Sequence, residues 1–228
     1  MIAIIGGTSL LESAVFAHVP ETRIETAFGE VVARQNNELL FVQRHGPPPH
    51  TPPHRINHHA NIDAIAQAGV RDIIAVNSTG SLKADLPPGE LVVPDDYFKL
   101  FELPTFFEET MRFTVPGLGK DVRQRLVDTA RSLEIPVRDG GVYCHVRGPI
   151  LETPAEIRFL ATIGDIVGMT MAHEAILARE RDLNYASVCM IDNFANGIGG
   201  QRLTLDQIDG TRAANLAAVE RLLTALLA

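Results

Sequence analysis

The chain has 228 residues, of which 46% are hydrophobic, and its formal net charge is −8. This length supports one large core, and we find no linker, low-complexity run or internal repeat, so we predict a single domain over residues 1–228. Scattered Lys and Arg without a basic stripe argue against a nucleic-acid partner, and the lack of an apolar run near ~20 residues argues against a membrane partner. We therefore expect a cytoplasmic protein.

The chain begins with a short apolar run, Ile2–Ile5, which is typical of a strand buried on both faces. This run leads into Gly6–Ser9, where backbone N–H groups and two hydroxyls form a candidate phosphate nest. The turn matches neither a Walker A loop nor the GxGxxG pattern, and structural turns of this composition are common. On its own it is a weak signal.

The next apolar run, Leu39–Val42, precedes a segment that holds five of the eight histidines, residues 44–61. One interpretation is a metal site made by His50, His54, His58 and His59 at i,i+4 spacing. Five prolines oppose a continuous helix there, and no Cys, Asp or Glu completes the ligand shell. The other interpretations are a solvated surface loop and an anion pocket. Arg44 at a strand end, with His45 beside it, favours the anion pocket.

Helical and strand patterns alternate through the rest of the chain. Apolar spacing predicts helices over Ile56–Ala68, Asp121–Leu133, Pro154–Ile163, Ala172–Glu180 and Leu205–Ala228. Apolar runs predict strands over Arg71–Val76, Gly140–Val146, Asp165–Val167 and Tyr185–Ile191, and a turn at Pro87-Pro88-Gly89 leads into the apolar segment Leu91–Pro94. Residues 99–118 fit neither pattern and indicate a long surface loop or a subunit contact. This order predicts an α/β fold with a mixed, mostly parallel central β-sheet flanked by helices.

Four strand ends carry residues suited to an anion. They are Gly7-Thr8, Arg44-His45, Asn77-Ser78-Thr79 and Met169-Thr170. Ligands of open α/β sheets bind at the carboxyl ends of the strands, and one cation with several hydroxyl and backbone donors can hold phosphate without a metal. A carboxylate and a carboxamide, Glu152 and Asn193, could read the edge of a heterocycle. The alternative is that Glu152 is a solvated turn residue and Asn193 a helix cap.

Taken together, these motifs resemble the trimeric purine nucleoside phosphorylase and methylthioadenosine phosphorylase family over essentially the whole chain. The matching segments are IIGGT, RHG, INHHAN (family VNYRAN), VNSTGSL, GPILETPAE, VGMTMAHEAILARERDL and CMIDNFANG. The resemblance implies a nucleoside phosphorylase fold and phosphorolysis, in which phosphate attacks the anomeric carbon of a purine nucleoside. The products are the free base and a sugar 1-phosphate. No cofactor is implied beyond phosphate as co-substrate, and the expected assembly is a homotrimer or a dimer of trimers.

The resemblance also assigns roles to individual residues. Phosphate would be held by Thr8, Arg44, His45, Ser78 and Thr170. Met169 would lie under the ribose, and Leu151 would occupy the place of an aromatic residue that packs on the base. Glu152 would accept a hydrogen bond from N1–H of the purine, and Asn193 would face N7 and the 6-substituent. Asn193, Glu152 and Arg44 are therefore the expected catalytic residues.

The chain departs from the family pattern at several points. His58 stands in place of Tyr, His173 in place of Pro, and Leu151 in place of the aromatic. Residues 96–119 form a shorter segment than in relatives, and Phe106, Phe107 or Phe113 is expected to replace a residue that completes the neighbour's sugar pocket. These departures keep open a catalytically weak nucleoside-binding protein, and a nucleoside hydrolase of the same fold class is a further alternative.

The expected substrate follows from two further positions. Relatives that take 6-aminopurines place Asp where this chain has Asn193 and Ala195, so we expect a preference for 6-oxopurines. The residues Leu203, Leu205 and Ile208 predict an apolar wall at the sugar 5′ end, which favours a methylthio group over a hydroxyl. We therefore expect 5′-methylthioinosine as the preferred substrate. Methylthioadenosine is the alternative, because a small loop shift would turn the carboxylate of Asp192 toward N7.

Overall fold

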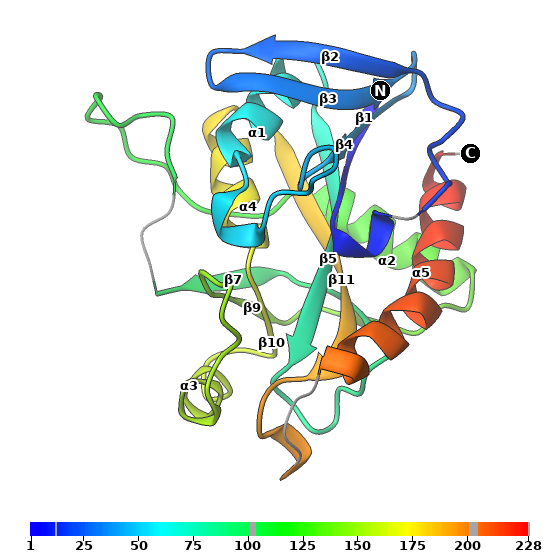
Figure 1. The fold of residues 1–228 in the computed structure, drawn as a ribbon, viewed down its shortest axis with the longest axis vertical. Helices are drawn as coiled ribbons and strands as arrows, with labels where there is room; N and C mark the ends of the chain where they lie inside the picture. Colours follow the sequence, from blue (N-terminus) through cyan, green and yellow to red (C-terminus); the bar gives the residue numbers. More distant parts are fainter. Residues whose placement is uncertain (12, 101–103, 201–204, 228) are drawn as a thin grey trace.

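The computed structural model describes residues 1–11, 13–100, 104–200 and 205–227, and for residues 205–214 the backbone alone. Its centre is a block of four parallel strands: β4 (Leu39–Gln43), β1 (Ile2–Gly6), β5 (Asp72–Ser81) and β11 (Asn184–Phe194) (Figure 1). These strands come from continuous apolar runs because both of their faces are covered. All five residues of β1, for example, are buried.

The sheet extends beyond this block on both sides. An antiparallel hairpin, β2 (Glu21–Thr26) and β3 (Gly29–Gln35), adds to β4. The sheet then divides at β5, whose carboxyl half pairs with β11 on one edge and with the antiparallel β10 (Ile166–Gly168) on the other. The remaining strands continue the two branches: β9 (Val142–His145) and β7 (Asp96–Lys99) beyond β10, and β6 (Leu91–Val93) and β8 (Val137–Asp139) beyond β11.

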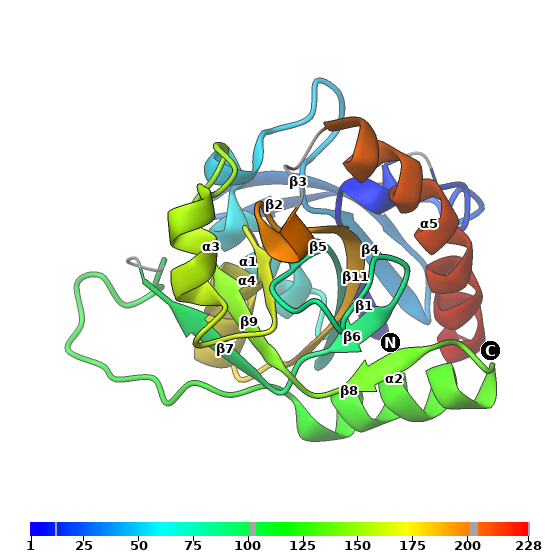
Figure 2. The same ribbon diagram turned by 90° about the horizontal axis from the view of Figure 1, so that it is seen from below.

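Helices cover the two faces of the central strands. On one side lie α1 (His58–Gln67) and α4 (Met171–Glu180), and on the other lie α2 (Lys120–Ser132) and α5 (Leu205–Leu227) (Figure 1). Alternate residues of β1 enter the two cores: Ala3 and Ile5 pack with the α1 and α4 side, and Ile2 and Ile4 with the α2 and α5 side. The short helix α3 (Pro154–Leu160) lies beside β9 (Figure 2). The α/β fold with a mixed sheet is confirmed.

The expected helices are confirmed to within a few residues at their ends. Thr153 caps α3: its hydroxyl accepts a hydrogen bond from the N–H of Glu156, and the Glu156 carboxylate accepts one from the N–H of Thr153. None of the helices in the described ranges has both the length and the apolar character that crossing a membrane requires.

The expected end of the strand after Arg71 is wrong. We predict the strand to stop at Val76, with Asn77-Ser78-Thr79 beyond it, whereas β5 continues to Ser81. It continues because β11 pairs with it as far as Ser81, and β10 pairs with Gly80 and Ser81. The polar residues therefore lie inside a paired strand, which holds their side chains more rigidly than a loop would.

Candidate active site

A cavity of about 200 Å³ opens where β1, β4, β5, β10 and β11 come together. Its lining includes every expected site residue whose side chain the structure describes: Thr8, Arg44, His45, Ser78, Leu151, Glu152, Met169, Thr170 and Asn193. Residues far apart in the sequence meet here because the carboxyl ends of parallel strands lie at one edge of the sheet.

One end of the cavity presents hydroxyl groups. The Thr8 and Ser78 hydroxyl oxygens lie 3.2 Å apart, one just after β1 and the other within β5. Gly7 brings the backbone close to them, since a Cβ at this position would clash with the Arg44 guanidinium and the Val76 carbonyl. The sequence pattern Gly7-Thr8 is therefore explained by close approach of the chain to a charged side chain.

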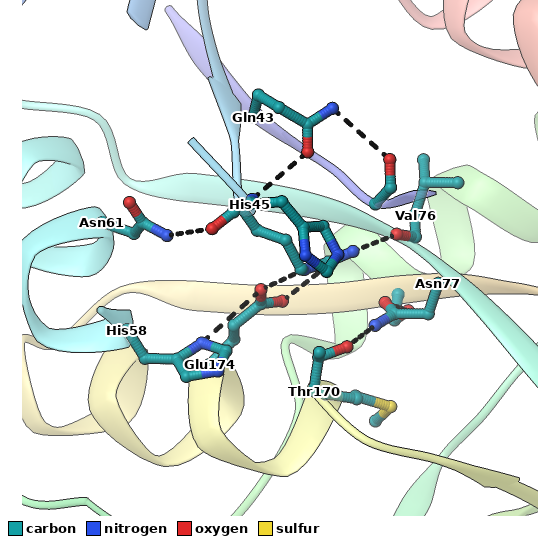
Figure 3. A network of polar contacts seen from close by, with 12 residues as sticks. Gln43, His45, His58, Asn61, Val76, Asn77, Thr170 and Glu174 are labelled. Atoms are coloured by element: carbon teal, nitrogen blue, oxygen red, sulfur yellow. Dashed lines mark hydrogen bonds and ion pairs between the residues drawn. The ribbon is translucent and has the colours of Figure 1, made fainter. Parts of the chain in front are cut away.

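Arg44 is the cation of this end, and it is 3% exposed. Its Nε and Nη2 donate to the two carboxylate oxygens of Glu174 at 2.6 and 3.0 Å, and Nη1 donates to the Val76 carbonyl at 2.7 Å (Figure 3). Burial acts to lower the pKa of Arg44, but the charge and hydrogen bonds of Glu174 outweigh it and raise that pKa. A guanidinium has five N–H donors, so Nη1 and Nη2 each retain one for an anion in the cavity.

His45 lies next to Arg44 and is also buried. Its Nδ1 is 2.7 Å from the Thr51 carbonyl oxygen, so Nδ1 carries the proton and Nε2 has the free lone pair in the neutral ring. Burial, with a smaller contribution from the Arg44 charge, lowers the pKa of His45. The segment that carries Arg44 and His45 is anchored by Asn61 of α1, whose side-chain amide donates to the Arg44 carbonyl at 3.2 Å (Figure 3).

Thr170 occupies the N-cap position of α4, so the helix begins at the cavity. Its hydroxyl oxygen accepts a hydrogen bond from the Asn77 amide at 2.7 Å, and Asn77 is held in turn by the Ser187 hydroxyl at 2.6 Å (Figure 3). Because its oxygen already accepts from Asn77, the Thr170 hydroxyl proton can be donated into the cavity. A helix N-terminus with a donor hydroxyl is a suitable anion site.

The opposite end presents Glu152 and Asn193. Glu152 is half-buried, and this burial raises the pKa of its carboxyl. The loop that carries it is tied down by Asn196, whose amide donates to the Glu152 carbonyl at 3.2 Å. The Asn193 side-chain N–H₂ donates to the Phe194 carbonyl at 2.8 Å. Glu152 is therefore not a fully solvated turn residue.

A β-bulge in β11 separates the paired residues Ile191 and Asn193, so that Asp192 and Asn193 both line the cavity. Without the bulge, consecutive residues would point to opposite faces of the sheet. Asp192 is 1% exposed, and its Oδ1 accepts a hydrogen bond from the Asn215 amide at 3.0 Å. The carboxylate is thus already tied to α5.

The four histidines that suggest a metal site do not gather. His50 and His54 are exposed, His58 is buried, and His59 packs between the rings of Phe28 and Phe106. Across the described ranges, no three or more His, Cys, Asp or Glu side chains are placed to hold a metal ion. The prolines keep this segment from forming the helix that would align the four rings, since only a 3₁₀ turn, Pro53–Arg55, forms before α1.

A different group of histidines does form, and we call it the histidine cluster: His58, His145 and His173. The Nε2 atoms of His145 and His173 are 3.1 Å apart, and the His58 and His173 ring centroids are 4.8 Å apart. Burial is the largest cause that lowers the pKa of all three, to about 3 for His145 and about 4 for His173. The neighbouring His173 lowers the pKa of His58 and His145 further, whereas the Glu174 charge partly opposes the lowering at His173. Two of the departures from the family pattern, His58 and His173, thus pack against each other.

Glu174 and Tyr143 are not among the expected site residues, and Asn77, expected only as one of the strand-end residues suited to an anion, contacts Thr170. Glu174 and Asn77 orient Arg44 and Thr170, and the hydroxyl of Tyr143 accepts a hydrogen bond from the Thr170 N–H at 3.2 Å. The signal for Glu174 is a carboxylate inside an apolar helix. Leu203 lies outside the described residues, and the side chains of Leu205 and Ile208 do too, so the apolar wall stays a prediction.

The histidine cluster predicts a stability that falls on acidification. A histidine in the unfolded chain has a pKa near 6.5, whereas His145 and His173 in the folded cluster have lower pKa values. Below about pH 6.5 the unfolded chain therefore binds more protons than the folded chain, which favours unfolding. Three such groups give a slope of at most roughly 4 kcal/mol per pH unit. We expect the free energy of unfolding, measured in urea, to be level above about pH 7.5 and to drop as pH falls below about 6.5.

The matched variants are His173→Gln and His18→Gln, the second at an exposed histidine. We expect His173→Gln to flatten the slope by up to roughly 1.4 kcal/mol per pH unit and His18→Gln to leave it unchanged. Equal slopes in the wild type and His173→Gln would contradict a neutral cluster.

Comparison with known proteins agrees with this geometry. The model of the phosphorylase superfamily matches residues 1–228. A probable 6-oxopurine nucleoside phosphorylase of Archaeoglobus fulgidus is 42% identical, over 91% of this chain and 88% of the relative. A probable S-methyl-5′-thioinosine phosphorylase of Methanothermobacter thermautotrophicus is 40% identical, over 91% and 76%. Among solved structures, methylthioadenosine phosphorylase of Schistosoma mansoni with adenine has a TM-score of 0.87 at 24% identity, over 99% of this chain and 90% of that one.

Proposed function

We propose that this chain, which belongs to the phosphorylase superfamily, is a purine nucleoside phosphorylase that uses inorganic phosphate to cleave the bond between base and sugar. The observation that carries the proposal is a single cavity with two unlike ends. One end gathers a buried guanidinium, three hydroxyls and a helix N-terminus, and the other a carboxylate and a carboxamide. Phosphate fits the first and a purine the second, with the sugar over Met169 between them.

This arrangement suits the charges of the reaction. As the bond breaks, positive charge develops on the sugar and negative charge on the departing purine. Phosphate held by Arg44, Thr8 and Thr170 stabilises the sugar, while a donor near N7 or O6 stabilises the base. Removing one such donor typically costs about 3 kcal/mol, or roughly a hundredfold in rate. Neither a covalent enzyme intermediate nor a further cofactor is needed, with phosphate as the co-substrate.

The proposed reaction predicts an absolute need for phosphate. Purified protein should release hypoxanthine from a 6-oxopurine nucleoside only when phosphate is present, and sugar 1-phosphate should form in equal amount. The assay follows base release by absorbance with and without phosphate. Equal rates without phosphate would establish a nucleoside hydrolase instead, and tight hypoxanthine binding with no turnover in ample phosphate would establish a binding protein.

The proposed substrates are 6-oxopurine nucleosides, with 5′-methylthioinosine preferred. Glu152 can accept the N1–H that hypoxanthine and guanine carry and adenine lacks. Ala195, which is 2% exposed, lines the cavity without a carboxyl group that could protonate N7. The names of relatives at 36–42% identity, 6-oxopurine nucleoside phosphorylase and S-methyl-5′-thioinosine phosphorylase, support this choice. Methylthioadenosine is the alternative substrate, because the similar solved structures are named methylthioadenosine phosphorylases.

A further prediction ranks three substrates by kcat/KM. We expect 5′-methylthioinosine to exceed inosine by roughly ten- to a hundredfold, the range for a small apolar group, and to exceed methylthioadenosine, which lacks the N1–H, by a larger factor. The double variant Asn193→Asp, Ala195→Asp should shift the preference toward methylthioadenosine, and Asn36→Asp, at an exposed residue remote from the cavity lining, is the control. A wild-type preference for methylthioadenosine would overturn our reading of Asn193 and Glu152.

We also propose that the protein works as a homotrimer or a dimer of trimers. The long loop 104–118 exposes Met111, Phe113 and Val115, at 93%, 91% and 75%, and apolar side chains so exposed suit a subunit contact. Light scattering should give a multiple of three times 24.8 kDa, and Phe113→Ser should weaken the assembly. A dilute monomer with full activity would contradict a site completed by a neighbouring subunit.

A further inference from the structure

Glu174 is a fully buried carboxylate, and the described contacts account for both of its oxygens. Oε1 accepts from Arg44 Nε at 2.6 Å, and Oε2 accepts from Arg44 Nη2 at 3.0 Å and from the Tyr185 hydroxyl at 2.8 Å. The carboxylate therefore accepts hydrogen bonds from the Arg44 guanidinium at both oxygens and from the neutral Tyr185 hydroxyl at Oε2. Its own contact with the cavity is indirect, because Glu174 is not among the lining residues.

Tyr185 lies near the start of β11 and is 2% exposed. Burial is the largest cause that raises the pKa of its phenol well above the ordinary value, and the charge of Glu174 is the second. The hydroxyl consequently keeps its proton over the whole working pH range and remains a donor to Glu174. Tyr185 also does not line the cavity, so it can affect a bound anion only through Glu174 and Arg44.

These contacts fix the plane of the guanidinium. Glu174 holds Nε and Nη2, the Val76 carbonyl holds Nη1, and the absence of a side chain at Gly7 leaves the space that Nη1 needs. The two remaining N–H bonds then have a set direction toward the cavity that Arg44 lines. Without the Tyr185 hydroxyl, Oε2 would lose a donor and the carboxylate could rotate about its last side-chain bond, taking the guanidinium with it.

His58 offers Glu174 a competing partner. Its Nδ1 lies 3.9 Å from Glu174 Oε1, and Figure 3 shows the ring beside the carboxylate. The burial that lowers the His58 pKa keeps this ring neutral, and the ring packs against His173. The cation that Glu174 binds is therefore Arg44. The Tyr185 hydroxyl is the neutral donor that holds the carboxylate in its orientation toward Arg44.

We propose that Tyr185 is a positioning residue for phosphate, acting through Glu174 to aim Arg44, an inference that rests on the proposed phosphorolysis. Its removal should act on phosphate and leave the nucleoside end of the cavity alone. For Tyr185→Phe we expect the KM for phosphate to rise about three- to tenfold, the range for losing one typical hydrogen bond, because the effect reaches phosphate only through Glu174 and Arg44. The KM for the nucleoside should stay within about twofold, because no contact of Glu152 or Asn193 changes.

The experiment measures both KM values and kcat for the wild type, Tyr185→Phe, Glu174→Gln and the control Tyr97→Phe. Tyr97 is a half-buried tyrosine of β7 that is not among the residues lining the cavity. The tyrosine that donates to the Glu174 carboxylate is Tyr185. Glu174→Gln should raise the phosphate KM by more than Tyr185→Phe does, and Tyr97→Phe should leave it unchanged. Hypoxanthine binding, measured by calorimetry, serves as a check that each variant is folded and keeps its base pocket.

The outcomes separate the two proposals. If the wild type needs no phosphate, the proposed function fails. If the wild type needs phosphate but Tyr185→Phe keeps a wild-type phosphate KM, the positioning role fails, even where the variant melts at a lower temperature. A rise in both KM values to the same degree would also overturn it, since it would indicate a general loss of structure. A selective rise in phosphate KM with unchanged hypoxanthine binding is the result that supports it.

Discussion

The buried ion pair between Arg44 and Glu174 is the constraint on which the rest of the site depends. Two charges taken out of water carry a desolvation cost that good geometry only just offsets, and breaking such a pair by removing one partner costs about 3–5 kcal/mol. The pair is retained in the core of this chain, with both side chains at most 3% exposed. It joins β4 to α4 across 130 residues of sequence. The carboxylate thus brings a cation to the cavity that would otherwise be too costly to bury.

The same pair explains why one helix and one strand supply so much of the site. Thr170 begins α4 at the cavity, and Glu174 follows one turn later on the same helix, so the hydroxyl and the guanidinium share one rigid support. On β11, Tyr185 holds Glu174 near the start of the strand, and Asn193 lines the cavity near its end. One paired strand, which is stiffer than a loop, thus both holds the carboxylate that binds Arg44 and presents Asn193 to the cavity.

The sequence predicts those features that depend on a pattern within one helix or strand, and it does not predict those that depend on contacts between distant residues. Strands with continuous apolar runs and helices with apolar spacing were predictable, and so were Thr8, Arg44 and Thr170, because each stands at the end of its own strand. The hairpin β2–β3 was not, since its polar, half-exposed residues carry a weak pattern. Glu174, Asn77 and the packing of His58 on His173 depend on partners about 90 to 130 residues away. No spacing within one element reveals such pairs.

The bulge at Asp192 has a consequence for how this site can change. Every residue of β11 before it keeps its partner on β5, from Asn184 opposite Asp72 to Ile191 opposite Thr79. The register slips by one position at Asp192, and the residues after it pair with β5 in the shifted register, Asn193 with Gly80 and Phe194 with Ser81. The side chains of Asp192 and Asn193 can therefore be replaced while the pairing of β11 from Asn184 to Ile191 is kept. In a protein built this way, the lining of the cavity at Asp192 and Asn193 can change through small local replacements while the strand that supports it keeps its place.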